Sequence, residues 1–313
     1  AATAPAPALS PSRLPAAKRP IGERVRSFFQ GLALNAATQL KPLDPATAVH
    51  IAPTADYNAD LVGVLSSQYE HFRDRVPLKG KRVLLKPNLV EFEPGTVINT
   101  HPHVVVGAAI ACRRAGAAAV VVAEGPGHRR DLEYLLGSTG MLDLLRSERV
   151  PFVDLNHDDV HAVQLRSSFT RLDELAIPQA ILDAEVVVSM PKMKTHHWAG
   201  LTCSMKNLFG VVPGAVYGWP KNLLHFHGIV ESILDLTATI RPHLAIVDGV
   251  VGMEGDGPIM GTAKQVGAVV MGRDPVAVDA SVARIMGLRP ERVAYLHEAA
   301  RYLGNIGRER IPM

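Results

Sequence analysis

Short apolar runs of strand length alternate with longer segments of helical periodicity along most of this chain. The expected strands lie at residues 48–52, 82–85, 119–123, 151–155, 185–190, 244–247 and 266–271. The expected helices lie at residues 58–72, 102–115, 132–146, 229–240, 275–286 and 292–302, with a short helix or turn at 178–182. Strands separated by helices form βαβ units. The sequence therefore predicts an α/β fold with a mostly parallel sheet and helices on both faces, an architecture that can also form two lobes around a cleft.

Composition divides the chain into two parts. Residues 1–47 start with an Ala/Pro-rich stretch and continue as an amphipathic segment, so we expect a flexible arm followed by a helix. This part is a candidate contact for a protein partner through residues 1–40. Residues 48–313 form the α/β domain, with a core at about 82–287. Because the chain starts at Ala1, it fits either an exported protein after removal of a signal peptide or a cytoplasmic protein after removal of Met.

Several classes of protein are disfavoured by composition. The net charge of +3 over 313 residues, without a long basic tract, argues against a nucleic-acid-binding protein. No run of eighteen apolar residues occurs, so we expect no membrane span. Cys112 and Cys203 are the only cysteines. Two thiols cannot complete an iron–sulfur cluster or a zinc knuckle from this chain alone.

The segment 191–207 carries the strongest chemical signal. It follows the apolar run 185–190 and contains Lys192, Lys194, His196, Lys206 and Asn207, with no Asp or Glu. In an open α/β sheet, ligands bind at the carboxyl ends of the strands. We therefore expect a cleft that binds a small anion, a carboxylate or a phosphate, and moves protons. A basic surface loop is the alternative.

Three residues of this segment are the candidate catalytic groups. Clustered ammonium groups lower one another's pKa values, which makes Lys194 or Lys206 a base or nucleophile near neutral pH. His196 is expected to carry a proton and to titrate in the working range. Further along, Lys221 and His225 add a cation and an imidazole for binding.

Polar residues also follow two other expected strands and open a helix. Lys86 and Asn88 come after the strand 82–85, and Glu124 and Gly125 come after the strand 119–123. Thr100 is a plausible N-cap of the helix 102–115, whose free N–H groups beside His101 can receive an anion. We expect these residues to line the same cleft. The alternatives are a surface turn for Lys86 and Asn88, a plain turn for Glu124 and Gly125, and a capping or packing role for His101.

Acidic residues gather in the glycine-rich segment 248–258. Asp248, Glu254 and Asp256 offer oxygen ligands for a divalent cation, or they pair with the lysines across the cleft. Asp274 fits the N-cap of the helix 275–286. Asp279 lies on an apolar stretch of that helix and needs a partner, for which one of the loop lysines is the expected choice.

Four ordered motifs give the chain a family resemblance. They are KPNL at 86–89, PKMKTHHWAGLTCSMKNLFG at 191–210, DGVVGMEGDGP at 248–258 and DPVAVDA at 274–280. On these, the chain resembles the family called domain of unknown function 362. Many of its members carry ferredoxin-like cysteines that this chain lacks.

A more distant resemblance concerns the chemistry. His196, Ala199, Gly200 and Lys206, followed by Pro213 and Gly214, resemble a segment of the nickel-dependent lactate racemase family. This resemblance implies a histidine, His196, that shuttles a proton. It also implies a lysine, Lys206, that holds a nickel-pincer nucleotide or anchors a substrate.

The leading hypothesis is an enzyme of the racemase, isomerase or oxidoreductase type that acts on a small anion. Its cofactor is left open between a divalent metal and a nickel-pincer-like nucleotide. Two alternatives stand beside it: a metal- or cofactor-delivery protein, and a non-catalytic accessory subunit of a larger complex.

Overall fold

The structure, a computed structural model, describes residues 47–127, 131–218 and 222–307. The strands are β1 (Val49–Pro53), β2 (Arg82–Pro87), β3 (Ala119–Glu124), β4 (Phe152–Asp154), β5 (Val160–Gln164), β6 (Glu174–Pro178), β7 (Val186–Met190), β8 (Lys192–His196), β9 (Gly200–Thr202), β10 (Leu244–Glu254) and β11 (Thr262–Gly272). The expected arm at 1–47 lies outside the described residues except for Thr47, so its helix and its partner stay predictions.

Helices connect and cover these strands. They are α2 (Leu61–Glu70), α3 (Pro102–Arg114), α4 (Leu132–Ser138), α5 (Met141–Ser147), α6 (Gln179–Asp183), α7 (Gly214–Tyr217), α8 (Asn222–Phe226), α9 (Ile229–Ile240), α10 (Pro275–Ile285) and α11 (Ala294–Ala299), with 3₁₀ helices η2 (Lys206–Val211) and η3 (Pro290–Arg292). One helix cap follows directly from the sequence. Asp274 caps α10 by accepting from the N–H groups of Val276 and Ala277, and Pro275 occupies its first position.

A nine-stranded sheet forms the centre of the described molecule. Its main order is β1-β11-β10-β7-β2-β3-β4, and β8 branches from β10 and pairs with β9. The pairs from β10 through β7, β2 and β3 to β4 are parallel, whereas β1, β11 and β10 pair antiparallel. The predicted α/β class with a mostly parallel sheet is therefore confirmed, with an antiparallel edge added.

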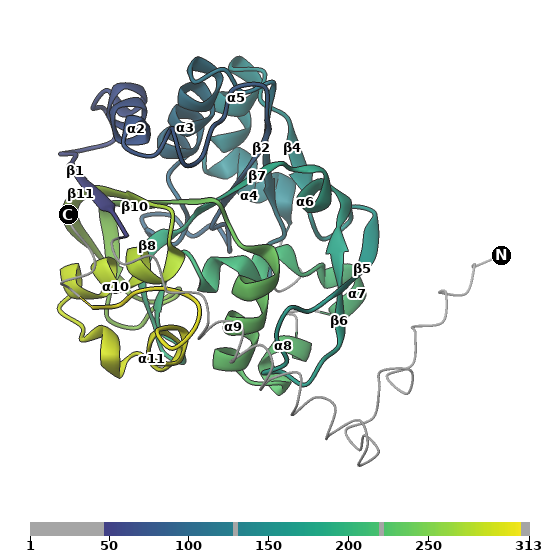
Figure 1. Ribbon diagram of the computed structural model, residues 1–313. Helices are drawn as coiled ribbons and strands as arrows, with labels where there is room; N and C mark the ends of the chain where they lie inside the picture. Colours follow the sequence, from purple (N-terminus) through teal and green to yellow (C-terminus); the bar gives the residue numbers. More distant parts are fainter. Residues whose placement is uncertain (1–46, 128–130, 219–221, 308–313) are drawn as a thin grey trace, which may run out of the picture.

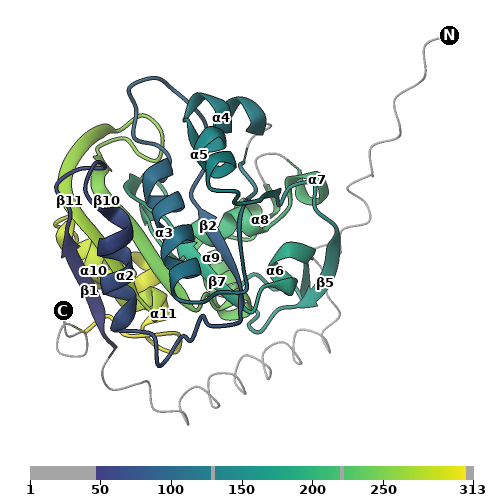
Figure 2. The ribbon, with the colours of Figure 1, turned by 90° about the horizontal axis from the view of Figure 1, so that it is seen from above.

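Helices cover both faces of the sheet (Figures 1 and 2). Successive residues of the central strands point to opposite sides. Val83 and Leu85 of β2 pack in the core under α2, α3 and α5, whereas Leu84 between them packs in the core under α9, α10 and α11. This burial on both faces explains why the central strands are continuous apolar runs.

The sequence analysis was wrong about two segments near the sheet edge. The basic segment expected as a loop forms strands β8 and β9, which pair as a hairpin with Lys194 opposite Thr202. The acidic segment after residue 247 belongs to the eleven-residue strand β10, which pairs with β11 and also with β8. Pairing on both sides extends β10 well beyond its apolar run. The two-stranded sheet β5–β6 was not predicted.

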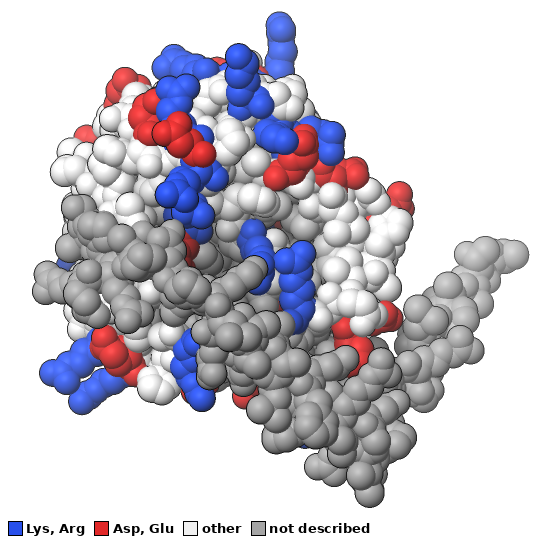
Figure 3. Space-filling view, in the orientation of Figure 1, with Lys and Arg blue, Asp and Glu red and all other residues white. Residues whose placement is uncertain are grey.

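No helix of the described residues is long and apolar enough to cross a bilayer. On the described surface visible in Figure 3, positive and negative side chains are interspersed.

Candidate functional site

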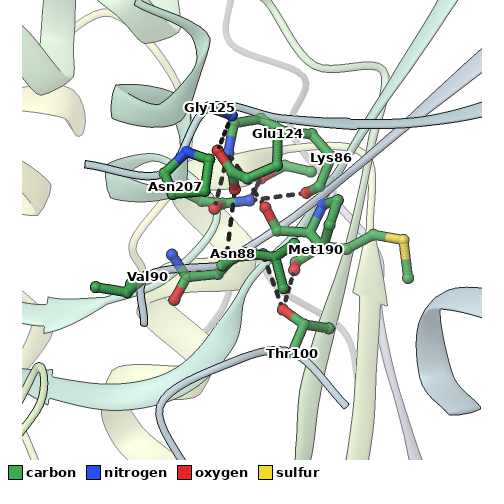
Figure 4. A network of polar contacts seen from close by, with 12 residues as sticks. Lys86, Asn88, Val90, Thr100, Glu124, Gly125, Met190 and Asn207 are labelled. Atoms are coloured by element: carbon green, nitrogen blue, oxygen red, sulfur yellow. Dashed lines mark hydrogen bonds and ion pairs between the residues drawn. The ribbon is translucent and has the colours of Figure 1, made fainter. Parts of the chain in front are cut away.

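Lys86 lies at the carboxyl end of β2, fully buried, at the centre of a polar network (Figure 4). Its Nζ donates to Glu124 Oε2 at 2.8 Å and to Asn207 Oδ1 at 3.2 Å. Asn207 Nδ2 in turn donates to the Lys86 carbonyl and to Ser189 Oγ. Burial lowers the pKa of Lys86, and the ion pair with Glu124 opposes this shift. The network joins the ends of β2 and β3 to η2.

A second buried ion pair joins β8 to β10. Lys192 Nζ of β8 donates to Asp248 Oδ2 of β10 at 2.9 Å and to the Tyr57 hydroxyl at 2.7 Å. Tyr57 donates to Asp248 Oδ1 at 3.0 Å and stacks on His101, with 3.6 Å between ring centroids. Burial, followed by the Asp248 charge, raises the pKa of Tyr57. Tyr57 was missed by the sequence analysis, because a single tyrosine in a turn gives no signal for a partner 191 residues away.

The start of α3 differs from the prediction. His101, rather than Thr100, is the N-cap, and its backbone N–H donates to Asp248 Oδ2 at 2.8 Å. The helix N-terminus therefore receives an anion, as its dipole favours, but that anion is a carboxylate of the same chain. Burial lowers the pKa of His101 to about 4.

Lys194 and Lys206 have no carboxylate partner among the described residues. Lys194, 1% exposed, donates to the Ile98 carbonyl at 2.8 Å. Lys206 Nζ lies over the Phe209 ring, 3.8 Å from its centroid, a cation–π contact. Loss of solvation lowers the pKa of each to about 7, with further lowering from Lys206 at Lys194 and from Lys86 at Lys206. Both values lie near neutral pH, but burial, rather than the neighbouring ammonium groups on which the prediction rested, is the larger cause.

His196 interacts electrostatically with Lys194 and Lys206, and its imidazole is held in one tautomer. Its Nδ1 accepts from the backbone N–H groups of Trp198 at 3.1 Å and Ala199 at 3.2 Å. Since both partners are donors, the neutral ring carries its hydrogen on Nε2. Burial and then the charge of Lys206 lower the pKa of His196 to about 3. The expectation that this histidine titrates near neutral pH is thus wrong, because burial and then the neighbouring charge of Lys206 disfavour an imidazolium.

Asn88, Thr100 and Gly125 form hydrogen bonds within the chain. Thr100 Oγ1 accepts from the Asn88 N–H and donates to the Met190 carbonyl, which ties the segment after β2 to the end of β7 (Figure 4). Gly125 N–H donates to Glu124 Oε1, and a Cβ on Gly125 would lie 2.7 Å from the Gly210 carbonyl. Asn88 Oδ1 is buried without a hydrogen-bond partner among the described residues, which leaves one acceptor available at this edge.

The three acids expected around a metal are not gathered. Asp248 pairs with Lys192 and accepts a hydrogen bond from Tyr57. Glu254 pairs with Lys264 on the surface, and Asp256 is exposed. Within the described ranges, no group of three or more His, Cys, Asp or Glu side chains is placed to hold a metal ion. The metal-ligand prediction for this trio is therefore wrong, and the alternative, pairing with a lysine across the site, holds for Asp248 alone.

Two further residues, His225 and Lys221, were predicted to bind the ligand. The His225 ring of α8 contacts the rings of Trp198 and Phe209, with centroids 5.6 and 5.9 Å away, and it is one cause of the lowered pKa of His196. Lys221 lies outside the described residues.

Asp279 is paired differently from the prediction. It accepts from the Ser204 and Met205 N–H groups, from the Ser204 hydroxyl and from the Tyr295 hydroxyl at 3.0 Å, and not from a lysine. These bonds fix the turn between β9 and η2, just before Lys206. Burial raises the pKa of Asp279 to about 6 and raises that of Cys203 well above its usual range, so Cys203 is no reactive thiol.

Comparison with known proteins identifies the family. The sequence model described as "Domain of unknown function (DUF362)" matches residues 83–284. The chain belongs to this family. It is also 31% identical over 222 residues to the thylakoid-associated protein sll1697 of Synechocystis sp., a match that covers 68% of this chain and 65% of that protein.

Two solved structures resemble the domain distantly. One is the lactate racemase apoprotein from Thermoanaerobacterium thermosaccharolyticum, with a TM-score of 0.44 and 12% identity over 72% of this chain and 56% of that chain. The other is a protein of Thermotoga maritima, with a TM-score of 0.42 and 14% identity over 76% of this chain and 61% of that chain.

Proposed function

We propose that this protein is an enzyme that binds a small carboxylate- or phosphate-bearing substrate against Lys194, Lys206 and His196 and moves a proton on it. The observation that carries this proposal is the imbalance of charge inside the site. Lys86 and Lys192 are each neutralised by a buried carboxylate, whereas Lys194 and Lys206 have none among the described residues. Desolvated cations without counter-ions are costly, and a bound anion removes that cost.

Lys206 is the centre of this arrangement. Among charged neighbours, it has the largest effect on the pKa of both His196 and Lys194. At neutral pH a substantial fraction of such an amine is unprotonated, so it can accept a proton from a bound substrate. His196 Nε2–H, held by the two backbone donors on Nδ1, donates a hydrogen bond to the oxygen on which negative charge develops. Lys194, fixed by the Ile98 carbonyl, orients the anion.

The trio Asp248, Glu254 and Asp256 does not fit a divalent ion. For a nickel-pincer-like nucleotide, Lys206 offers an amine without an ion-pair partner among the described residues and His196 lies in the same cluster. When bound, such a group would supply hydride chemistry. The lysines would hold its phosphate.

Binding is tested by calorimetry with inorganic phosphate and with pyruvate near pH 8, in buffers of different ionisation enthalpy. Because an added anion stabilises the ammonium form, the pKa values of Lys194 and Lys206 rise and binding takes up protons. We expect this uptake in the wild type and at least tenfold weaker binding in Lys206→Met. The exposed, charge-matched control is Lys264→Met. Unchanged binding in Lys206→Met, with lower stability alone, would show that the lysines form only a structural network.

Turnover is tested by incorporation of deuterium from D₂O into the methyl group of pyruvate, followed by proton NMR. We expect exchange above the buffer rate in the wild type, and a loss of at least tenfold in His196→Asn and in Lys206→Met. If pyruvate binds but all three proteins exchange at the buffer rate, proton transfer on this probe is refuted. Binding and delivery of an anionic ligand then becomes the better account.

A further inference from the structure

A hollow lies between the β8–β9 turn and the segment that joins α10 to α11. It has a volume of about 520 Å³, within the range of small-molecule sites. The turn forms one wall with Trp198 and Ala199, and the segment from the end of α10 to the start of α11 forms the other. None of the four site lysines lines it. The hollow therefore needs an explanation separate from the proposed function.

The aromatic wall is open to a ligand. Trp198 is 66% exposed, which is unusual for a side chain with so much apolar surface. The rings around it, His197 and His225, meet it nearly edge-on, at interplanar angles of 71° and 69°, and His196 is tilted at 48°. Within the described chain no ring stacks flat on the indole, so a planar guest can.

The opposite wall carries two arginines, Arg289 and Arg292. Arg289 is the N-cap of η3 and Arg292 is its last residue. Arg289 lies in extended backbone directly before this single turn of helix, so the two arginines flank one short element. Both are exposed and line the hollow, and neither makes an ion pair or side-chain hydrogen bond with a described residue. The acid between them, Glu291, approaches Arg284 instead, at 4.0 Å.

Apolar side chains lie beneath the two charges. Leu288 and Val293 line the hollow and belong to, or pack against, the core under α9–α11. A free inorganic anion would satisfy the arginines but leave the indole and these apolar groups uncovered. A neutral ring would leave the arginines unpaired. The two walls together match a flat ring that bears one charged group.

We propose that this hollow binds an aromatic anion, with its ring on Trp198 and its phosphate or carboxylate held by Arg289 and Arg292. Paired guanidinium groups suit such oxyanions because each offers a planar fork of donors. Occupancy also bears on His196, because the Trp198 and Ala199 amides that hold its Nδ1 belong to the wall of the hollow. The proposal does not depend on the proposed function.

The test uses phenyl phosphate as the probe and indole fluorescence as the signal. Only two tryptophans occur in the chain, so Trp219→Phe leaves Trp198 as the sole reporter. In this background we expect a saturable change in Trp198 emission. Inorganic phosphate and benzyl alcohol, which each lack one half of the probe, should bind at least tenfold more weakly.

Variants locate the bound probe. Arg289→Gln and Arg292→Gln should each weaken phenyl phosphate binding at least fivefold, whereas the exposed control Arg114→Gln and the variant Lys206→Met should not. Thermal melts followed by circular dichroism check that each variant is folded. The proposal is overturned if the probe gives no saturable signal, or if Lys206→Met abolishes binding while both arginine variants retain it. The latter result would place the anion among the lysines instead.

Discussion

At the scale of single residues, Asp248 does the most to hold the site together. Its carboxylate accepts from Lys192 Nζ, the Tyr57 hydroxyl and the His101 N–H. The Asp248 side chain is fully buried, and these bonds tie β8, β10, α3 and the turn before α2 to it.

Asp248→Asn should therefore be strongly destabilising. It removes the charge that balances Lys192, and breaking a buried ion pair on one side costs about 3–5 kcal/mol. Urea unfolding measures the change in the free energy of unfolding. The double variant Asp248→Asn/Lys192→Met should recover part of the loss, because it no longer buries an unpaired ammonium. The exposed control Asp256→Asn should stay within about 0.5 kcal/mol of wild type. Equal losses in Asp248→Asn and the control would contradict the assignment.

The sequence predicted the lysines of the site better than their partners. Lys86, Lys192 and Lys194 were placed by one local rule, because each follows an apolar strand toward the carboxyl edge. Their partners depend on tertiary contacts over long separations, such as Tyr57 with Asp248 or Ser204 with Asp279. No local pattern encodes these pairs. This is why Asp279 was assigned a lysine, and why Asp248 was left open between a metal and a lysine.

At the scale of elements, the misassigned β8 shows which signal was available. Lys192, Lys194 and His196 recur at every second position, which is the period of a strand. The run lacks apolar alternation because β8 buries polar residues in the site, so hydrophobicity alone predicts a loop. Placing it as a strand requires knowing that β10 extends far enough to pair with it.

The contact of η2 with the ends of β2 and β3 requires a glycine. A Cβ on Gly210 would lie 1.8 Å from Glu124 Oε1 and 2.5 Å from Lys86 Nζ. Gly210→Ala should thus push η2 away from the Lys86–Glu124 pair and lower the free energy of unfolding by about 1–3 kcal/mol, the usual cost of overpacking.

The matched control for this substitution is Gly137→Ala. Gly137 lies in α4, and a Cβ there meets nothing within 4 Å. We expect Gly137→Ala to leave stability unchanged or to raise it by up to about 1 kcal/mol. Chemical denaturation of both variants decides the point, and a Gly210→Ala protein as stable as wild type would refute the close approach.

At the scale of the whole molecule, the lysine cluster makes stability depend on pH. Unfolded lysines titrate near 10.4, whereas Lys194 and Lys206 have pKa values of about 7 in the fold. Between these values the unfolded chain binds more protons, so stability rises with pH. Below pH 7 both lysines are protonated in the folded protein, and the full cost of burying their charges lowers its stability.

We expect the free energy of unfolding to increase between about pH 7.2 and 8.2, by at most about 1.4 kcal/mol per pH unit for each of the two lysines. Above about pH 8.5, the buried thiols of Cys112 and Cys203 act in the opposite direction, because their pKa values are raised in the fold. Urea titrations across this window measure the slope. Lys194→Met/Lys206→Met should flatten it. A wild-type slope of zero would argue against desolvated lysines.

The anchored ring of His196 has a stereochemical consequence. With Nδ1 engaged by two amides, only one nitrogen of the imidazole can face a guest, and the ring cannot turn over without losing both bonds. An imidazole fixed in this way can exchange a proton with only one face of a planar intermediate. Inversion at carbon would then need a different group, from a different strand or helix, on the opposite face.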